Sequence, residues 1–139
     1  MAYELQAVIG REESIRSLAA ALPGATVVPL PQGLAMVPLV AALRARIDDR
    51  WLQRQSRGTA LALVSANIAG GTSGGQIASV WKDGEQVLRI APAELPGTTD
   101  SPISRALRLL GAVRSRPSED EFEALRLGRH RDTEHWLLP

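Results

Sequence analysis

The stretch from Thr59 to Ile90 predicts three consecutive β-strands, which limits the chain to folds built on an antiparallel sheet. Residues 59–68 are almost continuously apolar, as in a buried central strand. Residues 76–82 alternate in the manner of a second strand. Asp83-Gly84 is a strong hairpin signal, so residues 86–90 are expected to return antiparallel. Consecutive strands with short connections usually pair, so this segment should form the central meander of the sheet.

The remaining elements are predicted from apolar periodicity and from turn residues. Alternation indicates strands, whereas apolar residues at steps of three and four indicate helices, with Pro and Gly at their ends. The predicted strands cover residues 3–9, 26–30 and 34–37, and the predicted helices cover residues 12–22, 38–55 and 101–110, with a further helix starting at Ser118. The helix at 38–55 is expected to be the longest, and Gly10 is expected to end the first strand.

These elements predict a single α+β domain over residues 1–139. Its sheet should be antiparallel or mixed, with four to six strands and three to four helices packed mainly on one face. Partial alternation in residues 3–9 indicates that one face of the sheet is exposed.

Composition excludes several classes of function. Sixteen basic and fifteen acidic residues give a net charge of +1, which argues against a chain built mainly for electrostatic capture of nucleic acid or membranes. The chain has no Cys, which excludes disulfides, thiolate metal sites and a cysteine nucleophile. The N-terminus lacks the pattern of a secretory signal, and no apolar run is long enough for a membrane helix, so we expect a cytoplasmic protein.

A glycine-rich loop joins the first two strands of the predicted meander. It comprises Gly70, Gly71, Thr72, Ser73, Gly74, Gly75 and Gln76. Glycines let backbone donors approach an anion closely, but the loop lacks the Gly-Lys-Ser/Thr ending of a phosphate-binding loop and does not fit the dinucleotide fingerprint. The pattern favours a flexible hairpin loop, with contact to a ligand or partner as the alternative.

The C-terminal segment combines arginines with imidazoles and an aromatic residue: Arg129, His130, Arg131, His135 and Trp136. The two histidines are five residues apart, which places them about 140° apart on a helix, so they do not form a metal pair. We predict neither a metal nor another cofactor. Arg and Trp are enriched at interfaces, so we predict this segment as the partner-binding site. A solvated tail, or one packed into the core, is the alternative.

Arg46, Arg50 and Arg54 recur at steps of four on the longest predicted helix. This stripe is a candidate nucleic-acid face. Asp48 and Asp49 lie within ion-pair reach on the same helix, however, which is typical of an ordinary solvated helix face. Docking of an acidic protein surface is a further alternative.

Three stretches resemble those of small stand-alone proteins from GC-rich actinobacteria. They are residues 70–84 (GGTSGGQIASVWKDG), 101–111 (SPISRALRLLG) and 120–136 (DEFEALRLGRHRDTEHW). In size and general build the chain is also similar to the immunity proteins of polymorphic toxins, which are small α+β chains that block a cognate toxin. The first resemblance implies no activity, and the second implies binding to a toxin.

The sequence therefore favours a non-enzymatic protein-binding module, with neutralisation of a toxin or another enzyme as its most specific form. No acid, base, nucleophile and oxyanion donor occur at spacings that assemble a catalytic site. One alternative is an enzyme or binder of a small anionic ligand that uses the 70–76 loop together with the 129–135 segment. A second is weak nucleic-acid binding through the Arg46, Arg50 and Arg54 stripe.

Overall fold

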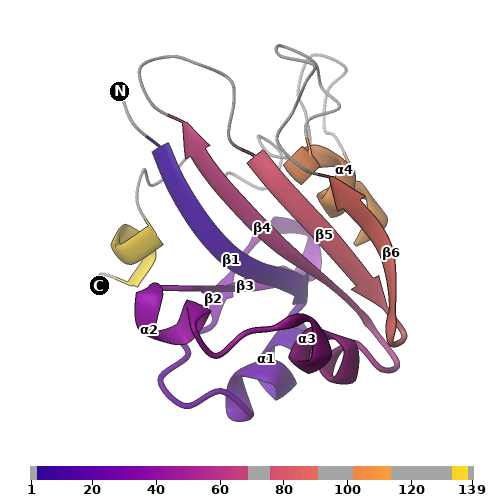
Figure 1. Ribbon diagram of the computed structural model, residues 1–139, viewed down its shortest axis with the longest axis horizontal. Helices are drawn as coiled ribbons and strands as arrows, with labels where there is room; N and C mark the ends of the chain where they lie inside the picture. Colours follow the sequence, from indigo (N-terminus) through magenta and orange to yellow (C-terminus); the bar gives the residue numbers. More distant parts are fainter. Residues whose placement is uncertain (1–2, 69–75, 91–101, 114–132, 138–139) are drawn as a thin grey trace.

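The computed structural model of the protein describes residues 3–68, 76–90, 102–113 and 133–137 (Figure 1). They form a six-stranded sheet in the order β2-β3-β1-β4-β5-β6, and all neighbouring strands are antiparallel. The strands are β1 (Tyr3–Arg11), β2 (Val28–Pro29), β3 (Leu34–Pro38), β4 (Ala60–Ile68), β5 (Gln76–Lys82) and β6 (Glu85–Ile90). The helices are α1 (Glu12–Ala20), α2 (Ala41–Arg44), α3 (Asp49–Gln55) and α4 (Pro102–Leu109), with 3₁₀ turns η1 (Pro31–Gly33) and η3 (Thr133–Leu137). The predicted α+β fold with an antiparallel sheet is confirmed.

The predicted meander forms the centre and one side of this sheet. Strands β4, β5 and β6 pair in sequence, and the Asp83-Gly84 turn brings Lys82 opposite Glu85. Asp83 and Gly84 have φ angles of 50° and 81°, as expected for the two central residues of a type I′ turn. The hairpin prediction is therefore confirmed at the level of its turn.

Both faces of β1 are buried over its middle part, whereas the expected exposed face is present only farther along the sheet, where Ile77 of β5 is exposed. In β1, Ala7, Val8 and Ile9 are all fully buried. The strand also continues beyond Gly10. A side chain at Gly10 would lie 3.1 Å from the Ala60 carbonyl oxygen, so this glycine permits close packing inside the strand rather than ending it.

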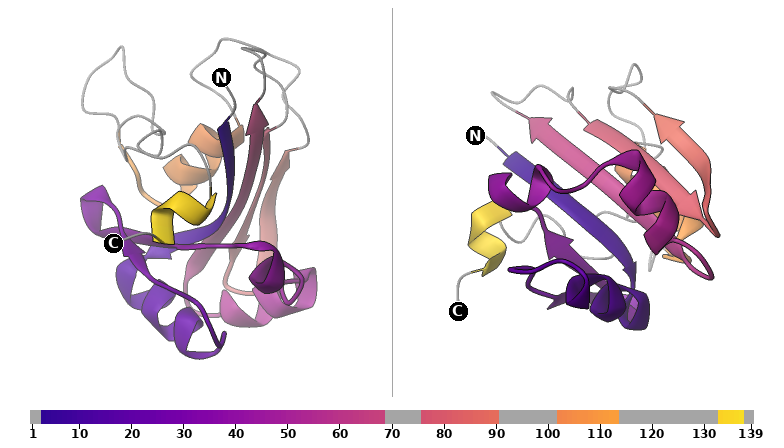
Figure 2. Two further views of the ribbon diagram at one scale, coloured as in Figure 1. Left: turned by 90° about the vertical axis from the view of Figure 1, so that its left-hand side faces the viewer. Right: turned by 60° about the horizontal axis from the view of Figure 1, so that its bottom comes forward.

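Two hydrophobic layers lie on opposite faces of the sheet. We call one the α4 layer; its helical members include Ile103, Leu107 and Trp136. We call the other the α1 layer; its members from outside the sheet include Ile15, Leu18, Leu43 and Leu52. Figure 2 shows α4 and η3 on one side of the sheet, and α1, α2 and α3 grouped at one end of the other side. The expected cover by helices on one face holds for α1 to α3, whereas α4 packs on the opposite face.

The prediction of a single helix over residues 38–55 is wrong. Pro38 ends β3, and the chain then forms the two short helices α2 and α3. Asp48 interrupts the pattern, because its backbone is extended (φ −131°, ψ 176°) and its carboxylate accepts a hydrogen bond from the Trp51 N–H at 2.8 Å. A short acidic side chain in this position starts a new helix more readily than it continues an old one.

Helix α4 has the predicted start and end. It begins at Pro102, and Gly111 has a φ of 98° just after its last turn. The N–H groups of Gly111 and Ala112 donate to the carbonyls of Arg108 and Leu107 at 3.0 Å, which is a Schellman closure. None of the helices in the described ranges is long and apolar enough to cross a membrane.

Candidate functional site

The predicted partner-binding segment divides between described and undescribed residues. Arg129, His130 and Arg131 lie outside the described residues, and His135 lies within η3. Trp136 is only 6% exposed and packs in the α4 layer. The expectation that Trp136 anchors a partner at the surface is therefore wrong, because its indole ring completes a core that the helical and strand patterns alone did not reveal.

The start of η3 is bonded to an edge of β1 that β3 does not cover. The Thr133 hydroxyl, on a residue 1% exposed, accepts from the Gln6 N–H at 3.1 Å and donates to the Glu4 carboxylate at 2.6 Å. The Gln6 carbonyl accepts from the Leu39 N–H at 2.7 Å. Thr133 thus satisfies a strand donor that would otherwise be orphaned, and this part of the C-terminal segment belongs to the fold.

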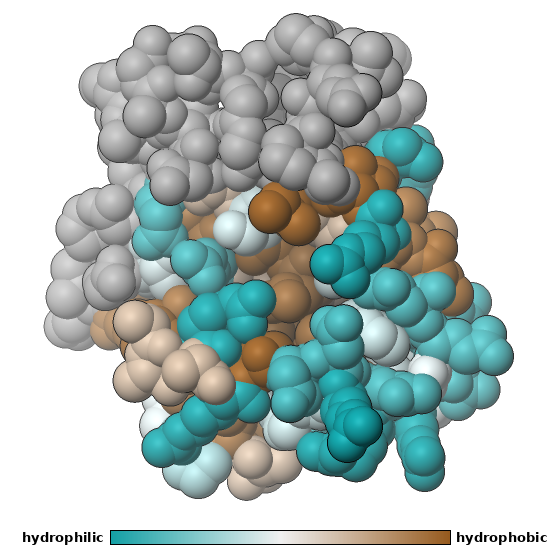
Figure 3. Space-filling model, in the orientation of Figure 1, coloured by the Kyte–Doolittle hydropathy of each residue, from teal (hydrophilic) through white to brown (hydrophobic). Residues whose placement is uncertain are grey.

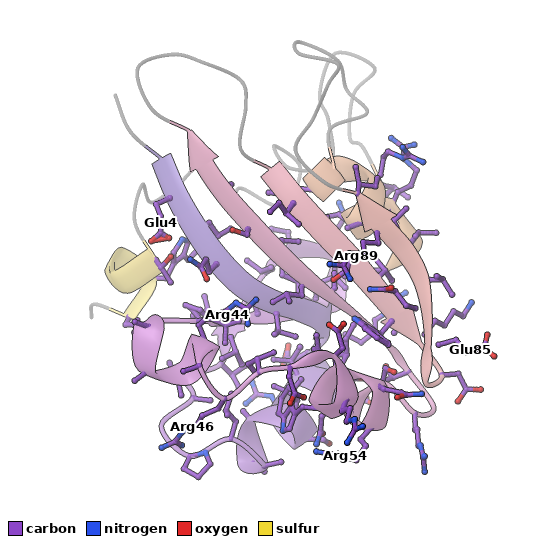
Figure 4. All side chains as sticks on the ribbon, viewed as in Figure 1. Glu4, Arg44, Arg46, Arg54, Glu85 and Arg89 are labelled. Carbon is purple, nitrogen blue, oxygen red and sulfur yellow. The ribbon has the colours of Figure 1, made fainter. Side chains whose placement is uncertain are left out.

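The other two predicted sites have different outcomes. Residues 70–75 of the glycine-rich loop lie outside the described residues, and Gln76 begins β5. A composite site of this loop and the 129–135 segment therefore stays a prediction. The arginine stripe does not form as one helical face: Arg46 lies between α2 and α3, where it donates to the Pro23 carbonyl at 3.3 Å, and only Arg50 and Arg54 share a helix. Figure 4 shows Arg46 and Arg54 apart on the surface.

An uncovered area of the sheet is the most distinctive surface among the described residues. Two cross-strand rows lie beyond the end of the sheet that α1, α2 and α3 cover. Strand pairing aligns Gln6, Ser65 and Ile77 in one row, and Leu63, Ser79 and Arg89 in the next. We call these six residues the open half-face. They share a face with Trp81, which is 7% exposed and buried by the helices, whereas Ile77 is 47% exposed.

Figure 3 shows this side of the molecule as a hollowed apolar area bordered by hydrophilic side chains. Arg44 and Arg89 flank it from opposite sides in Figure 4. Arg44 is half-buried and donates to the Ile47 carbonyl at 3.0 Å. Arg89 lies 3.9 Å from the Asp49 carboxylate, an exposed pair that contributes little to stability. A surface that combines the apolar side chains of Leu63 and Ile77 with small polar residues and with arginines at its border has the composition of a protein interface.

The alternation of residues 76–82 places Ile77 and Trp81 on the same face of β5. The shared direction is correct, but the exposure of Ile77 depends on how far the helices reach along the strands. Alternation specifies only the face of a strand, so no sequence signal distinguished the covered half from the open half.

Two shallow cavities lie on either side of Gly58 and Thr59. One has a volume of about 290 Å³ between α1 and the start of β4, where the hydroxyls of Ser14 and Thr59 are 2.5 Å apart. The other has a volume of about 400 Å³ and is lined by Arg11, Ala60, Lys82, Asp83 and Leu110 besides these two residues. The described residues contain no group of three or more His, Asp or Glu side chains that could hold a metal ion.

Comparisons with protein-family models, with curated proteins and with solved structures found no significant match for this chain.

Proposed function

We propose that this chain is a non-enzymatic protein-binding module whose partner docks on the open half-face. The observation that carries the proposal is the 47% exposure of Ile77 on β5, on the same face of the sheet as the buried Trp81. An isolated exposed Ile has little meaning. Ile77, however, is joined on the same face by half-buried Leu63 and by flanking arginines, so a partner would cover apolar and charged groups together.

The open half-face also supports docking because of its rigidity. Its residues come from β1, β4, β5 and β6, which are held by a continuous antiparallel ladder. A partner would therefore meet side chains that are already ordered, and binding would cost less conformational entropy than docking on a loop.

Site-specific photo-crosslinking tests this proposal. A photoreactive amino acid would replace Ile77 in the full chain, expressed in its native host, and the control would carry the same group at Leu109. Leu109 is 51% exposed on α4, the helix that covers the other face. We expect a discrete protein adduct from position 77 and none from position 109. Equal adducts from both positions, or none from position 77, would contradict the proposal.

The identified partner then allows a quantitative test. Ile77→Ser should weaken its binding by at least about tenfold, the usual effect of removing a central apolar anchor. Leu109→Ser should leave the affinity unchanged, and circular dichroism of both variants should match the parent chain. Neutralisation of a toxin or of another enzyme is the specific form of this function that the similarity in size and general build to immunity proteins suggests. Inhibition of the partner's activity by the parent chain, but not by Ile77→Ser, is its expected outcome.

A further inference from the structure

We propose that the cavity between Arg11 and Lys82 binds a small organic carboxylate with an apolar body. This site is independent of the proposed protein docking. It lies on the side of the sheet that α4 covers, because Arg11 and Lys82 are each two residues along their strand from Ile9 and Val80 of the α4 layer and therefore share their face. Loss of one function would therefore leave the other measurable.

The strand register places two cations on either side of a small residue. Ala60 is paired with Lys82 across β4 and β5. Arg11 follows Gly10, whose partner on β4 is Leu61, so Arg11 lies beside Ala60 at the end of β1. Neighbouring strands are about 4.8 Å apart, which separates the Arg11 and Lys82 backbones by roughly 10 Å. The methyl group of Ala60 leaves the space between the two long side chains open, and the cavity of about 400 Å³ occupies it.

The two cations lack carboxylate partners within the described part of the chain. Its ion pairs join Arg16 to Glu12 and Arg89 to Asp49, and neither involves the cavity. Asp83 also lines the cavity, but its Oδ1 accepts from the Gly58 N–H at 3.0 Å and holds the hairpin turn. The cavity therefore carries a net positive charge, and a single carboxylate between Arg11 and Lys82 would balance it.

The rest of the lining favours an apolar body on the ligand. Leu110, which is 5% exposed, closes the cavity from the end of α4, and Ala60 packs against the α4 layer. The Arg11 guanidinium lies over Gly111, where a Cβ atom would be 2.9 Å from its Nη2. Lys82 is thus the more available of the two cations, and the apolar part of the ligand would contact Leu110. A cavity of this volume is at the small end of the range for ligand sites.

A titration of the full-length ¹⁵N-labelled chain with sodium hexanoate tests the assignment by NMR. We expect saturable shifts in the millimolar range, concentrated at Thr59, Ala60, Lys82 and Leu110. Hexanol and inorganic phosphate are the comparison probes, because hexanol lacks the charge and phosphate lacks the apolar body. Both should bind at least about fivefold more weakly than hexanoate.

Two variants identify the groups that bind the probe. Lys82→Gln should weaken hexanoate binding by about two- to fivefold, whereas the matched control Arg57→Gln should have no effect, since Arg57 lines only the neighbouring cavity. Ala60→Leu should abolish binding by filling the space, with dispersed amide signals as evidence that the variant is folded. The proposal is overturned if hexanoate gives no saturable shifts, if phosphate or hexanol binds equally well, or if Lys82→Gln keeps the parent affinity.

Discussion

Replacement of Trp136 by Ala should destabilise the whole protein, although only three residues follow it in the sequence. The ring is 6% exposed and belongs to the same hydrophobic layer as Leu5, Met36 and Leu107. A buried Trp removes about 150–250 Å² from water. At about 25 cal/mol per Å² this corresponds to roughly 4–6 kcal/mol, which is an upper estimate because the unfolded chain is itself partly compact.

Measured losses in the free energy of unfolding for Trp-to-Ala changes in protein cores support a slightly lower estimate for Trp136. They cluster at about 3–5 kcal/mol, because neighbouring side chains relax only in part. For a chain of this length such a loss corresponds to a decrease in Tm of about 10–15 °C. It is also a large fraction of the about 5–15 kcal/mol that stabilises a typical domain. Deletion of residues 133–139 should therefore unfold the protein.

Urea denaturation followed by tryptophan fluorescence and circular dichroism measures the effect. Leu137→Ala is the matched control, since Leu137 is 37% exposed on the same 3₁₀ turn and should cost at most about 1 kcal/mol. A loss below about 1 kcal/mol for Trp136→Ala would refute the reasoning. It would mean that the C-terminal turn is detached in solution and that Trp136 is available for recognition after all.

Two further substitutions test local bonds on which the fold depends. Thr133→Val should lower the free energy of unfolding by about 1–3 kcal/mol in urea denaturation, because the Gln6 N–H and the Glu4 carboxylate lose their hydroxyl partner. Thr133→Ser keeps the hydroxyl and should retain most of the stability. Equal losses for the two variants would argue against these hydrogen bonds. Asp48→Ala should lower the free energy of unfolding by about 1 kcal/mol, because it removes the carboxylate that accepts from the Trp51 N–H at the start of α3. Asp48→Asn should retain most of this stability. An unchanged denaturation midpoint for Asp48→Ala would show that α3 needs no cap.

Features of the fold that depend on neighbouring residues were predictable from the sequence. The Asp83-Gly84 turn is an example, because it needs two consecutive residues with positive φ angles, a conformation that Gly, Asn and Asp adopt more readily than other residues. The glycine after α4 is another, since Gly111 takes the left-handed conformation that closes a helix. In both cases a dipeptide or a single residue determines the geometry.

The helix predicted over residues 38–55 shows where periodicity misleads. Leu39, Leu43 and Ile47 are all buried, as a helical stripe requires. The same spacing is compatible with a chain that turns around one cluster, and Asp48 favours the turn by bonding to the Trp51 N–H. The hydrophobic pattern thus identified which residues are buried but not the path between them.

The two candidate sites depend on strand order, which the sequence left open. Arg11 and Lys82 are 71 positions apart, and only the placement of β4 between β1 and β5 brings their side chains to either side of Ala60. Ile77 and Trp81 lie on the same face of β5, yet they are 47% and 7% exposed. The reason is that α1, α2 and α3 cover the end of the strands that contains Trp81 and do not reach the open half-face that contains Ile77. A different strand order, or a shift of one residue in the pairing of β4, would move Arg11 away from Lys82 without changing any local sequence pattern. For this chain, function therefore has to be sought in what the register brings together, and both proposed sites are testable by single substitutions on strands whose pairing is known.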